Sequence, residues 1–221
     1  MTLIKRMMAA VLLLVLVACD AAMPSNRLPE TPLGLQAIFR FKGQEHFLEV
    51  ISAEDFHANI AYFWRGKQYA STRYYRGLFP VTGTQDNARY DIDVDTSHID
   101  ALFPLAVDKE ASFGGTFVKD TTGAVADIWV HMSVLKETKM TMKDTSYQVF
   151  VIEIQTQFRY GDTGTTTKNT VYYAPDIGLI LKSVIHENNN KFEWRVTSVE
   201  LPDTQDTSVR RRRNNRGTVM I

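Results

Sequence analysis

The sequence contains almost no cysteine: Cys19 is the only one among 221 residues. A disulfide within the chain is therefore excluded, although an exported domain would be free to form disulfides. Cys19 is not expected to act as a catalytic nucleophile, because it ends an apolar leader and has no folded surroundings that would lower the pKa of its thiol.

The usual signatures of catalysis are also missing. The sequence has no His-Glu-x-x-His motif, no Gly-x-Ser-x-Gly elbow and no glycine-rich phosphate loop. Its five histidines are scattered, with no two spaced four residues apart (His46, His57, His98, His131 and His186). We therefore predict no catalytic residue, no metal and no cofactor, and keep an unrecognised hydrolase, assembled from distant residues, as the least favoured alternative.

One acidic motif requires a choice between two interpretations. Asp91, Asp93 and Asp95 are spaced like the start of a calcium loop, but such a loop needs glycine at its sixth position and glutamate at its twelfth. The residues there are Thr96 and Leu102. We therefore interpret the aspartates as the solvent-facing side of a strand and predict no calcium site.

Charge is distributed unevenly along a chain whose formal net charge is zero. The segment from Gly34 to Pro202 holds 17 basic and 21 acidic residues, a net charge of −4. A mildly acidic body predicts no nucleic-acid partner, because nucleic-acid binding requires a basic face. The segment 203–221, with arginines at 210–213 and 216, is predicted to be a disordered tail. An alternative role is attraction to anionic lipid.

The N-terminus predicts export. Lys5 and Arg6 precede an apolar run that ends in Leu16-Val17-Ala18-Cys19, which is the form of a secretory signal peptide. The last four residues resemble the lipobox of bacterial lipoproteins. This resemblance implies that Cys19 is diacylated, becomes the first mature residue and is then N-acylated, so that it anchors the protein to a membrane. An ordinary cleaved signal and an uncleaved anchor are the alternatives.

The resemblance also suggests which membrane holds the protein. Asp20 resembles the inner-membrane retention signal of enteric lipoproteins, which favours the periplasmic face of the inner membrane over the outer membrane. Residues 19–33 then form the lipidated N-terminus and a proline-containing tether that can hold a domain up to roughly 40 Å from the bilayer. The predicted organisation is a signal peptide (1–18), this tether (19–33), a β domain (34–202) and a basic tail (203–221).

Alternating apolar and polar residues, typical of half-buried strands, recur along the predicted domain. Gly77, Pro80 and Gly83 are expected to interrupt this pattern, and one short helix is expected near residues 97–103, before Pro104. Short connections between the segments predict an all-β antiparallel meander. The clearest strand segments are 35–41, 58–64, 69–76, 90–94, 111–118, 125–135, 147–160, 165–173, 179–185 and 191–201.

Two short motifs carry a family resemblance. Leu102-Phe103-Pro104-Leu105 after the helix, and the segment from Tyr172 to Leu179 (Tyr-Tyr-Ala-Pro-Asp-Ile-Gly-Leu), resemble those of proteobacterial envelope lipoproteins and periplasmic proteins. The resemblance implies a highly curved antiparallel sheet, a half-barrel or β-clam. The implied architecture is similar to that of capsule-related lipoproteins and, more remotely, to that of periplasmic lipoprotein carriers. It implies no catalytic residue.

An aromatic and basic hairpin is the candidate ligand face. Its aromatic residues could stack on sugars or lie near lipid headgroups, whereas the alternative interpretation is that they only stabilise the hairpin through cross-strand pairs. The predicted face consists of Tyr62, Trp64, Tyr69, Tyr74 and Tyr75.

Together these observations predict a non-catalytic envelope lipoprotein, anchored to the membrane through Cys19. Its curved sheet is expected to bind a lipid, a glycan or a protein in the periplasm. The alternative is an interaction subunit of an envelope complex, which would bind its partner through an exposed strand edge.

Overall fold

The structure is a computed structural model that describes residues 30–85, 88–120, 123–187 and 190–202. Several predictions lie outside the described residues. They are the signal peptide, the lipidation of Cys19, the role of Asp20, the tether up to residue 29 and the tail (203–221). Within those ranges, no helix is long and apolar enough to cross a membrane.

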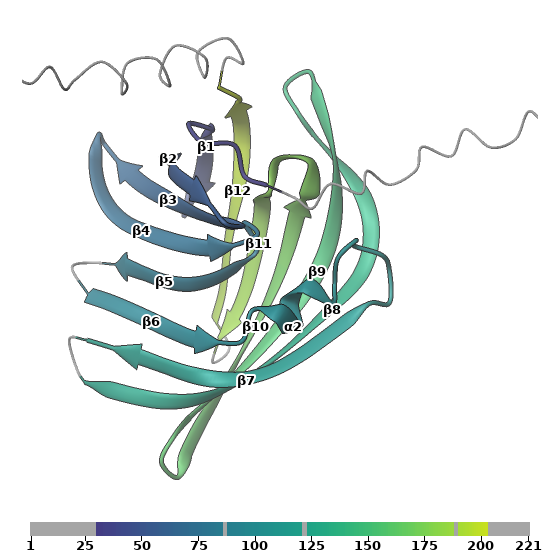
Figure 1. The fold of residues 1–221 in the computed structure, drawn as a ribbon. Helices are drawn as coiled ribbons and strands as arrows, with labels where there is room; N and C mark the ends of the chain where they lie inside the picture. The colour runs from purple at the N-terminus through teal and green to yellow at the C-terminus, as the bar shows by residue number, and fades with distance from the viewer. Residues whose placement is uncertain (1–29, 86–87, 121–122, 188–189, 203–221) are drawn as a thin grey trace, which may run out of the picture.

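The described residues form twelve antiparallel strands, each paired with the next along the chain (Figure 1). This order confirms the predicted meander. The strands are β1 (Gln36–Phe41), β2 (Gln44–Glu54), β3 (His57–Trp64), β4 (Lys67–Tyr75), β5 (Phe79–Gln85), β6 (Ala88–Val94), β7 (Glu110–Lys119), β8 (Ala124–Met142), β9 (Thr145–Tyr160), β10 (Thr163–Ala174), β11 (Leu179–Glu187) and β12 (Asn190–Glu200).

The sheet closes into a barrel, so the predicted open half-barrel or β-clam is wrong. β1 pairs with β12 from Gln36 opposite Glu200 to Phe41 opposite Trp194, with a bulge between Ile38 and Phe39. These partners are between 153 and 164 positions apart in the chain. Alternation within a strand reveals which side chains face the core, but it carries no information about so distant a partner.

Two clusters of buried side chains form the core. A first cluster gathers side chains from β4, β5, β7–β11 and the helical segment, among them Leu78, Ile99 and Ile152. A second gathers side chains from β1–β3 and the ends of β8 and β9, among them Leu48 and Ile60. Complete burial of each such side chain contributes roughly 1.5–3 kcal/mol, so these clusters hold the barrel together.

Part of the sheet separates the two clusters and is buried on both faces. In β11, Leu179 and Leu181 pack in the second cluster, whereas Ile180 between them packs in the first. In β9, Val149 and Phe150 divide in the same way. Strands covered on both faces contain continuous apolar runs instead of alternating residues, which explains the sequence Leu-Ile-Leu at 179–181.

β5 corrects the expectation that Gly77, Pro80 and Gly83 interrupt the strands. The strand continues through Pro80, beside a register shift in β4, and through Gly83. A Cβ atom at Gly83 would lie 2.6 Å from the Tyr90 hydroxyl oxygen. Proline at a bulge and glycine beneath a neighbouring ring are both compatible with a strand, so these residues are adapted to the sheet.

The long β8–β9 hairpin also extends beyond its prediction. β8 was expected to end at residue 135, but it is 19 residues long and reaches Met142. Met140 and Met142 are buried in the second cluster while Thr141 between them is exposed. The tip of the hairpin therefore packs onto the barrel through one face.

The predicted short helix is confirmed: α2 spans Ser97–Asp100 and is followed by a turn. Ile99 and Leu102 are fully buried beneath it. The reversal before β11 is a 3-10 turn, η1 (Pro175–Ile177), that ends at Gly178 with a φ of 55°. Both elements lie at the end of the barrel where the described chain begins and ends. A Cβ atom added to Gly34 would lie 3.7 Å from the Pro202 Cβ, and Thr31 donates a hydrogen bond to the Gly178 carbonyl oxygen.

Candidate ligand-binding site

The predicted ligand face lies on the β3–β4 hairpin, and its members point in different directions. Trp64 and Tyr69, at the turn of the hairpin, are 38% and 37% exposed. Tyr62 and Tyr74 are half-buried and pack against the core, whereas Tyr75 is buried. Adjacent residues of a strand point to opposite faces, which separates Tyr75 from Tyr74. The role of all five residues in ligand binding stays a prediction.

Trp64 and Tyr69 begin a continuous array of rings that leads into the barrel. The His46 ring centroid lies 6.4 Å from that of Trp64, 5.5 Å from that of Tyr69 and 5.1 Å from that of Phe39. Phe39 in turn contacts Tyr62 edge to face at 6.0 Å. Separations of 4.5–7 Å are those at which aromatic rings attract one another. We call these five residues the aromatic array; it extends from partly exposed rings to the buried Phe39.

His46 and Phe39 are the members of the array that the sequence did not single out, and His46 is the polar one. Burial lowers the pKa of its imidazole, so the ring is neutral near pH 7. Its Nδ1 is buried and has no hydrogen-bond partner among the described residues. A buried polar atom without a partner is rare in proteins, and this one lies within the array, in contact with Trp64 and Tyr69.

A group of hydroxyls adjoins the array through Tyr62. The Tyr62 and Tyr74 hydroxyl oxygens are 3.0 Å apart, and the Thr72 hydroxyl lies 3.3 Å from that of Tyr90. Burial raises the pKa of Tyr62, Tyr74 and Tyr90. These phenols are therefore neutral near pH 7, and they can donate and accept hydrogen bonds but cannot act as bases. Periodicity in the sequence could not show that Tyr90 lies near this hairpin, because Tyr90 is on β6 and β5 lies between β6 and β4.

Tyr75 belongs to a different environment, beneath α2. Its hydroxyl donates to Asp100 Oδ1 at 2.7 Å, and Arg76 Nε donates to the same oxygen at 2.5 Å. The Arg76 side chain is only 2% exposed and its guanidinium lies 4.3 Å from the centroid of the Phe56 ring. Tyr173 donates a hydrogen bond to the Arg76 carbonyl oxygen. The Tyr75 hydroxyl is therefore already used to hold α2 against the barrel.

The ion pair beneath α2 shifts the titration of its carboxylate. Burial acts to raise the pKa of Asp100, but hydrogen bonds from Arg76 and Tyr75 outweigh it and hold the pKa below its ordinary value. Asp100 is consequently ionised at neutral pH, and its negative charge compensates the positive charge of the buried Arg76 guanidinium.

The acidic motif of the sequence lies on β6 and just after it. Asp91 accepts two hydrogen bonds from Arg89, at 3.1 and 3.2 Å, and Asp95 accepts one from the Ser97 backbone N–H at 3.0 Å. Hydrogen bonds from Thr82 and Arg89 lower the pKa of Asp91. Across the residues that the structure describes, no group of three or more His, Cys, Asp or Glu side chains could hold a metal ion.

Comparison with known proteins relates this chain to others by fold. No protein-family model matches it, and no curated protein gives a significant match to its sequence. Among solved structures, it is similar to the hypothetical lipoprotein YmcC from Escherichia coli K12, with a TM-score of 0.52 and 11% identity over 76% of this chain and 85% of that one. It is also similar to a Bacteroides fragilis protein with a YmcC-like fold, with a TM-score of 0.50 and 12% identity over 79% of this chain and 100% of that one. Identities this low show a shared fold and nothing more.

Proposed function

We propose that this protein is a non-catalytic lipoprotein of the bacterial cell envelope that binds a ligand at the turn end of its barrel, through the aromatic array. The observation that carries the binding role is the array itself, because it joins partly exposed rings to a buried imidazole nitrogen without a described partner. The lipobox at Leu16-Val17-Ala18-Cys19 supports the anchor, and the similarity of fold to a protein named as a lipoprotein agrees with it.

The position of the array agrees with binding away from the anchor. In a meander the hairpin turns alternate between the two ends of the barrel, so the turn at Arg65-Gly66 lies opposite α2. Figure 1 shows the β3–β4 turn at the left, with α2 to its right near the middle of the view. The described chain begins and ends on the α2 side. A lipid at Cys19 would therefore leave Trp64 and Tyr69 directed away from the tethered end.

The chemistry of the array favours a ligand with both apolar and hydroxyl-rich surfaces. Flat faces such as those of Trp64 and Tyr69 contact the apolar face of a sugar ring or an acyl chain. The His46 Nδ1 could accept or donate one directional hydrogen bond, depending on its tautomer. A glycan combines these features in a single molecule and is the ligand class that we favour.

The anchor and the ligand can be tested separately. In a bacterial host, metabolic labelling with an alkyne analogue of palmitate should label the wild-type chain and should not label a Cys19→Ser variant. Membrane fractionation of the labelled protein would then identify the inner or the outer membrane. An unmodified Cys19 in the mature protein would contradict the anchor.

For the ligand, native mass spectrometry of the full chain should detect a bound glycan or lipid that is lost in the Trp64→Ala variant. The matched control is Trp129→Ala, since Trp129 is 53% exposed on β8 and is not part of the array. Equal ligand occupancy in both variants would contradict a role for the array.

An interaction subunit remains the second candidate, and one feature of β8 favours it. From residue 135 to Met142, β9 is the only described strand that pairs with β8, because the pairing of β8 with β7 ends at Ser133. A partner strand could add to this edge. Lys136 and Lys139 lie on it, however, and lysines on edge strands oppose such pairing. A stoichiometric partner that co-purifies with the wild-type chain and is lost from the Thr138→Pro variant would favour this candidate.

A hydrolase finds only partial support in the arrangement of side chains. The Ser112 hydroxyl lies 2.8 Å from His131 Nδ1, across the β7–β8 pair. The neighbouring carboxylate of Glu153 is instead bonded to Gln155 and Lys168. Ser112 is exposed on the outer face of a strand. Ester hydrolysis that disappears in Ser112→Ala would be needed to revive this alternative.

A further inference from the structure

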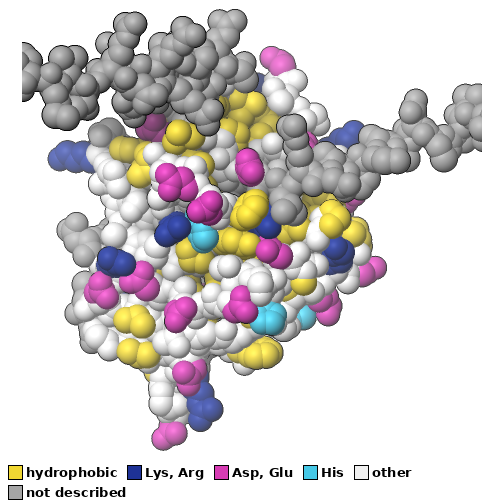
Figure 2. All heavy atoms as spheres, in the orientation of Figure 1, with side chains coloured by type: hydrophobic (Ala, Val, Ile, Leu, Met, Phe, Trp, Pro, Cys, Tyr) yellow, Lys and Arg dark blue, Asp and Glu magenta, His cyan; other side chains and the backbone are white. Residues whose placement is uncertain are grey.

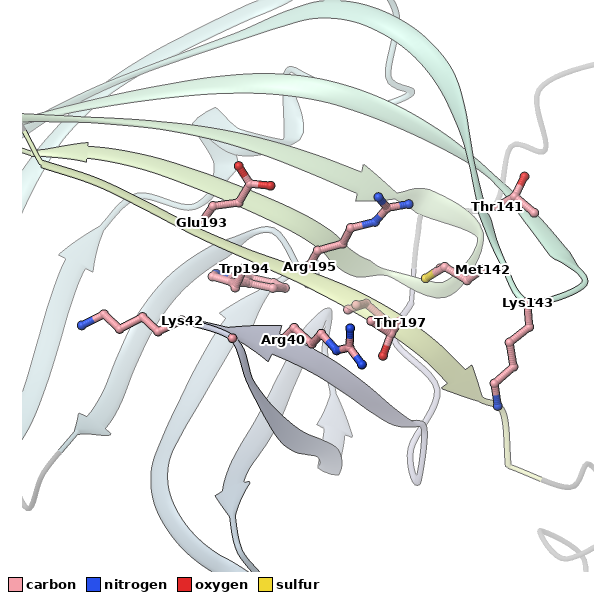
Figure 3. A pocket seen from close by; sticks show the side chains of 11 residues that line it. Arg40, Lys42, Thr141, Met142, Lys143, Glu193, Trp194, Arg195 and Thr197 are labelled. Carbon is pink, nitrogen blue, oxygen red and sulfur yellow. The ribbon is translucent and has the colours of Figure 1, made fainter.

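A groove on the outside of the barrel is lined mainly by basic side chains among its charged residues. It encloses about 630 Å³ between the β1–β12 pair and the tip of the β8–β9 hairpin (Figure 3). We call it the basic groove. Its charged lining residues are Arg40, Lys42, Lys143, Glu193 and Arg195, and its other lining side chains include Thr141, Met142 and Thr197. The lining therefore carries four cations and one anion, on a domain whose net charge is negative.

Most of these cations have no carboxylate partner. Among the described residues, no ion pair joins Arg195 or Lys143 to a carboxylate. Arg40 forms one with Glu45 at 3.0 Å, but both side chains are more than 60% exposed, so water screens the pair. The single acidic residue, Glu193, is bonded to Lys182 at 2.9 Å and is 3.7 Å from Lys191. The positive charge of the groove is thus largely uncompensated.

The backbone places two of the cations side by side. Arg40 on β1 is directly opposite Arg195 on β12, and both are exposed on the outer face of the barrel. Like charges at directly opposite positions in an antiparallel pair are destabilising. By contrast, the face of the protein drawn in Figure 2 shows basic and acidic side chains intermixed. A concentrated, unfavourable charge pair is the pattern expected where an anion binds.

Neighbouring contacts hold the cations in position. Met142 is buried in the second core cluster, which fixes the hairpin tip and the adjacent Lys143. The Thr197 hydroxyl donates to the Ile38 carbonyl oxygen at 3.2 Å, across the bulge of the β1–β12 pair. Lys42 lies 5.2 Å from the centroid of the Phe41 ring. The groove is therefore built on paired strands and a packed hairpin, which favours a preformed site.

We infer that the basic groove binds a phosphate-bearing ligand, either a phospholipid or glycolipid headgroup or a free phosphomonoester. A phosphomonoester carries a charge of about −1.5 to −2 near pH 7 and three acceptor oxygens. Arginine offers planar, paired donors to such a group, and lysine adds a point charge. This inference rests on the proposed function only for the membrane anchor at Cys19. It does not depend on the ligand of the aromatic array, because the groove is distinct from that array.

The headgroup is the source that the geometry favours. The lining extends from the β1–β2 turn at Lys42 to the β8–β9 turn at Lys143. The latter lies at the α2 end of the barrel, where the described chain begins and ends. An acylated Cys19 would keep this end near the bilayer, within reach of phosphate groups.

The test uses the full mature chain in neutral detergent micelles. Isothermal titration calorimetry would follow the binding of glycerol 3-phosphate in solution and, separately, of short-chain phosphatidic acid mixed into the micelles, with short-chain phosphatidylcholine as the zwitterionic reference. The variants are Arg195→Gln and Lys143→Gln. The matched control is Lys168→Gln, which removes one exposed cation of β10, paired with Glu153, outside the groove.

We expect phosphatidic acid to bind the wild-type chain and the Lys168→Gln control equally, and to bind each groove variant about tenfold more weakly. Affinity for glycerol 3-phosphate that falls in the same variants would identify a soluble ligand instead of a headgroup. Equal affinity in all four proteins, or no binding in any arm, would overturn the inference. Such a failure leaves the acylation of Cys19 and the Trp64-dependent ligand untouched, so it is distinguishable from failure of the proposed function.

Discussion

Two sets of arginines in this barrel are held in opposite ways. Arg76 is buried beneath α2. There Asp100 accepts a hydrogen bond from the Arg76 Nε–H, and three aromatic rings contact the guanidinium. Arg40 and Arg195 are exposed and occupy directly opposite positions of the β1–β12 pair. The first arrangement holds the helix to the sheet. The second is expected to cost some stability, which is consistent with the phosphate site that we infer.

Removing the buried Arg76 guanidinium should destabilise the fold strongly. Arg76→Ala removes the partner of Asp100 and opens the packing beneath α2, so we expect the free energy of unfolding to fall by about 3 kcal/mol. Urea denaturation followed by circular dichroism measures this change. Arg76→Met, which keeps an apolar stem, should recover part of the loss. A loss below about 1 kcal/mol for Arg76→Ala would show that the pair does not hold α2.

The aromatic array should show a gradient from its inner to its outer end. Phe39 is 5% exposed, so Phe39→Ala should cost roughly 3–5 kcal/mol through the cavity that it leaves. Trp64 is partly exposed, so Trp64→Ala should cost about 1 kcal/mol. The two variants would be compared by urea denaturation. Equal costs would contradict the assignment of Trp64 to a surface that is free to bind a ligand.

The ion pair beneath α2 should also make stability depend on pH. The pKa of Asp100 is lower in the folded protein than in the unfolded chain. Its contribution is therefore complete above the unfolded pKa, near about 3.9, and is lost as the pH falls through the folded pKa. Asp100→Asn should lose stability at pH 7 and respond less to acid below about pH 4. Parallel acid titrations of both proteins in urea would check this expectation.

The smallest effect has the opposite sign. Arg195→Gln removes the repulsion with Arg40, so we expect the free energy of unfolding to rise by about 0.3 kcal/mol at low ionic strength. The gain should shrink in 0.5 M salt, because salt at about this level screens exposed charges. Chemical denaturation at two salt concentrations measures the difference. A destabilised Arg195→Gln variant would show that the guanidinium has a structural role instead.

Sequence reasoning succeeded where the signal is local. Alternation correctly predicted strands over 90–94 and 147–160, and the short helix was expected near residues 97–103. It failed at β5, where Pro80 and Gly83 looked like interruptions. Their compatibility with a strand depends on a bulge in β4 and on the Tyr90 ring, and neither contact can be read from neighbouring residues.

The candidate sites show the same limit. Trp64 and Tyr69 were singled out because aromatic residues cluster on one hairpin, but the part played by His46 depends on β2 lying beside that hairpin. Arg40, Lys143 and Arg195 attracted no attention, since they come from three distant segments. Arg40 and Arg195 occupy opposite positions only because the first and last strands pair.

The sequence by itself determined the single cysteine at the end of a segment that resembles a lipobox, the all-β meander and the short helix near residue 97. Composition, motif and periodicity are properties of adjacent residues. Closure of the barrel, burial of β9 and β11 on both faces and assembly of the aromatic array and the basic groove were decided only by tertiary structure. Each of these requires hydrogen bonds or contacts between residues far apart in the chain, and alternation along a strand does not specify which strand will be its neighbour.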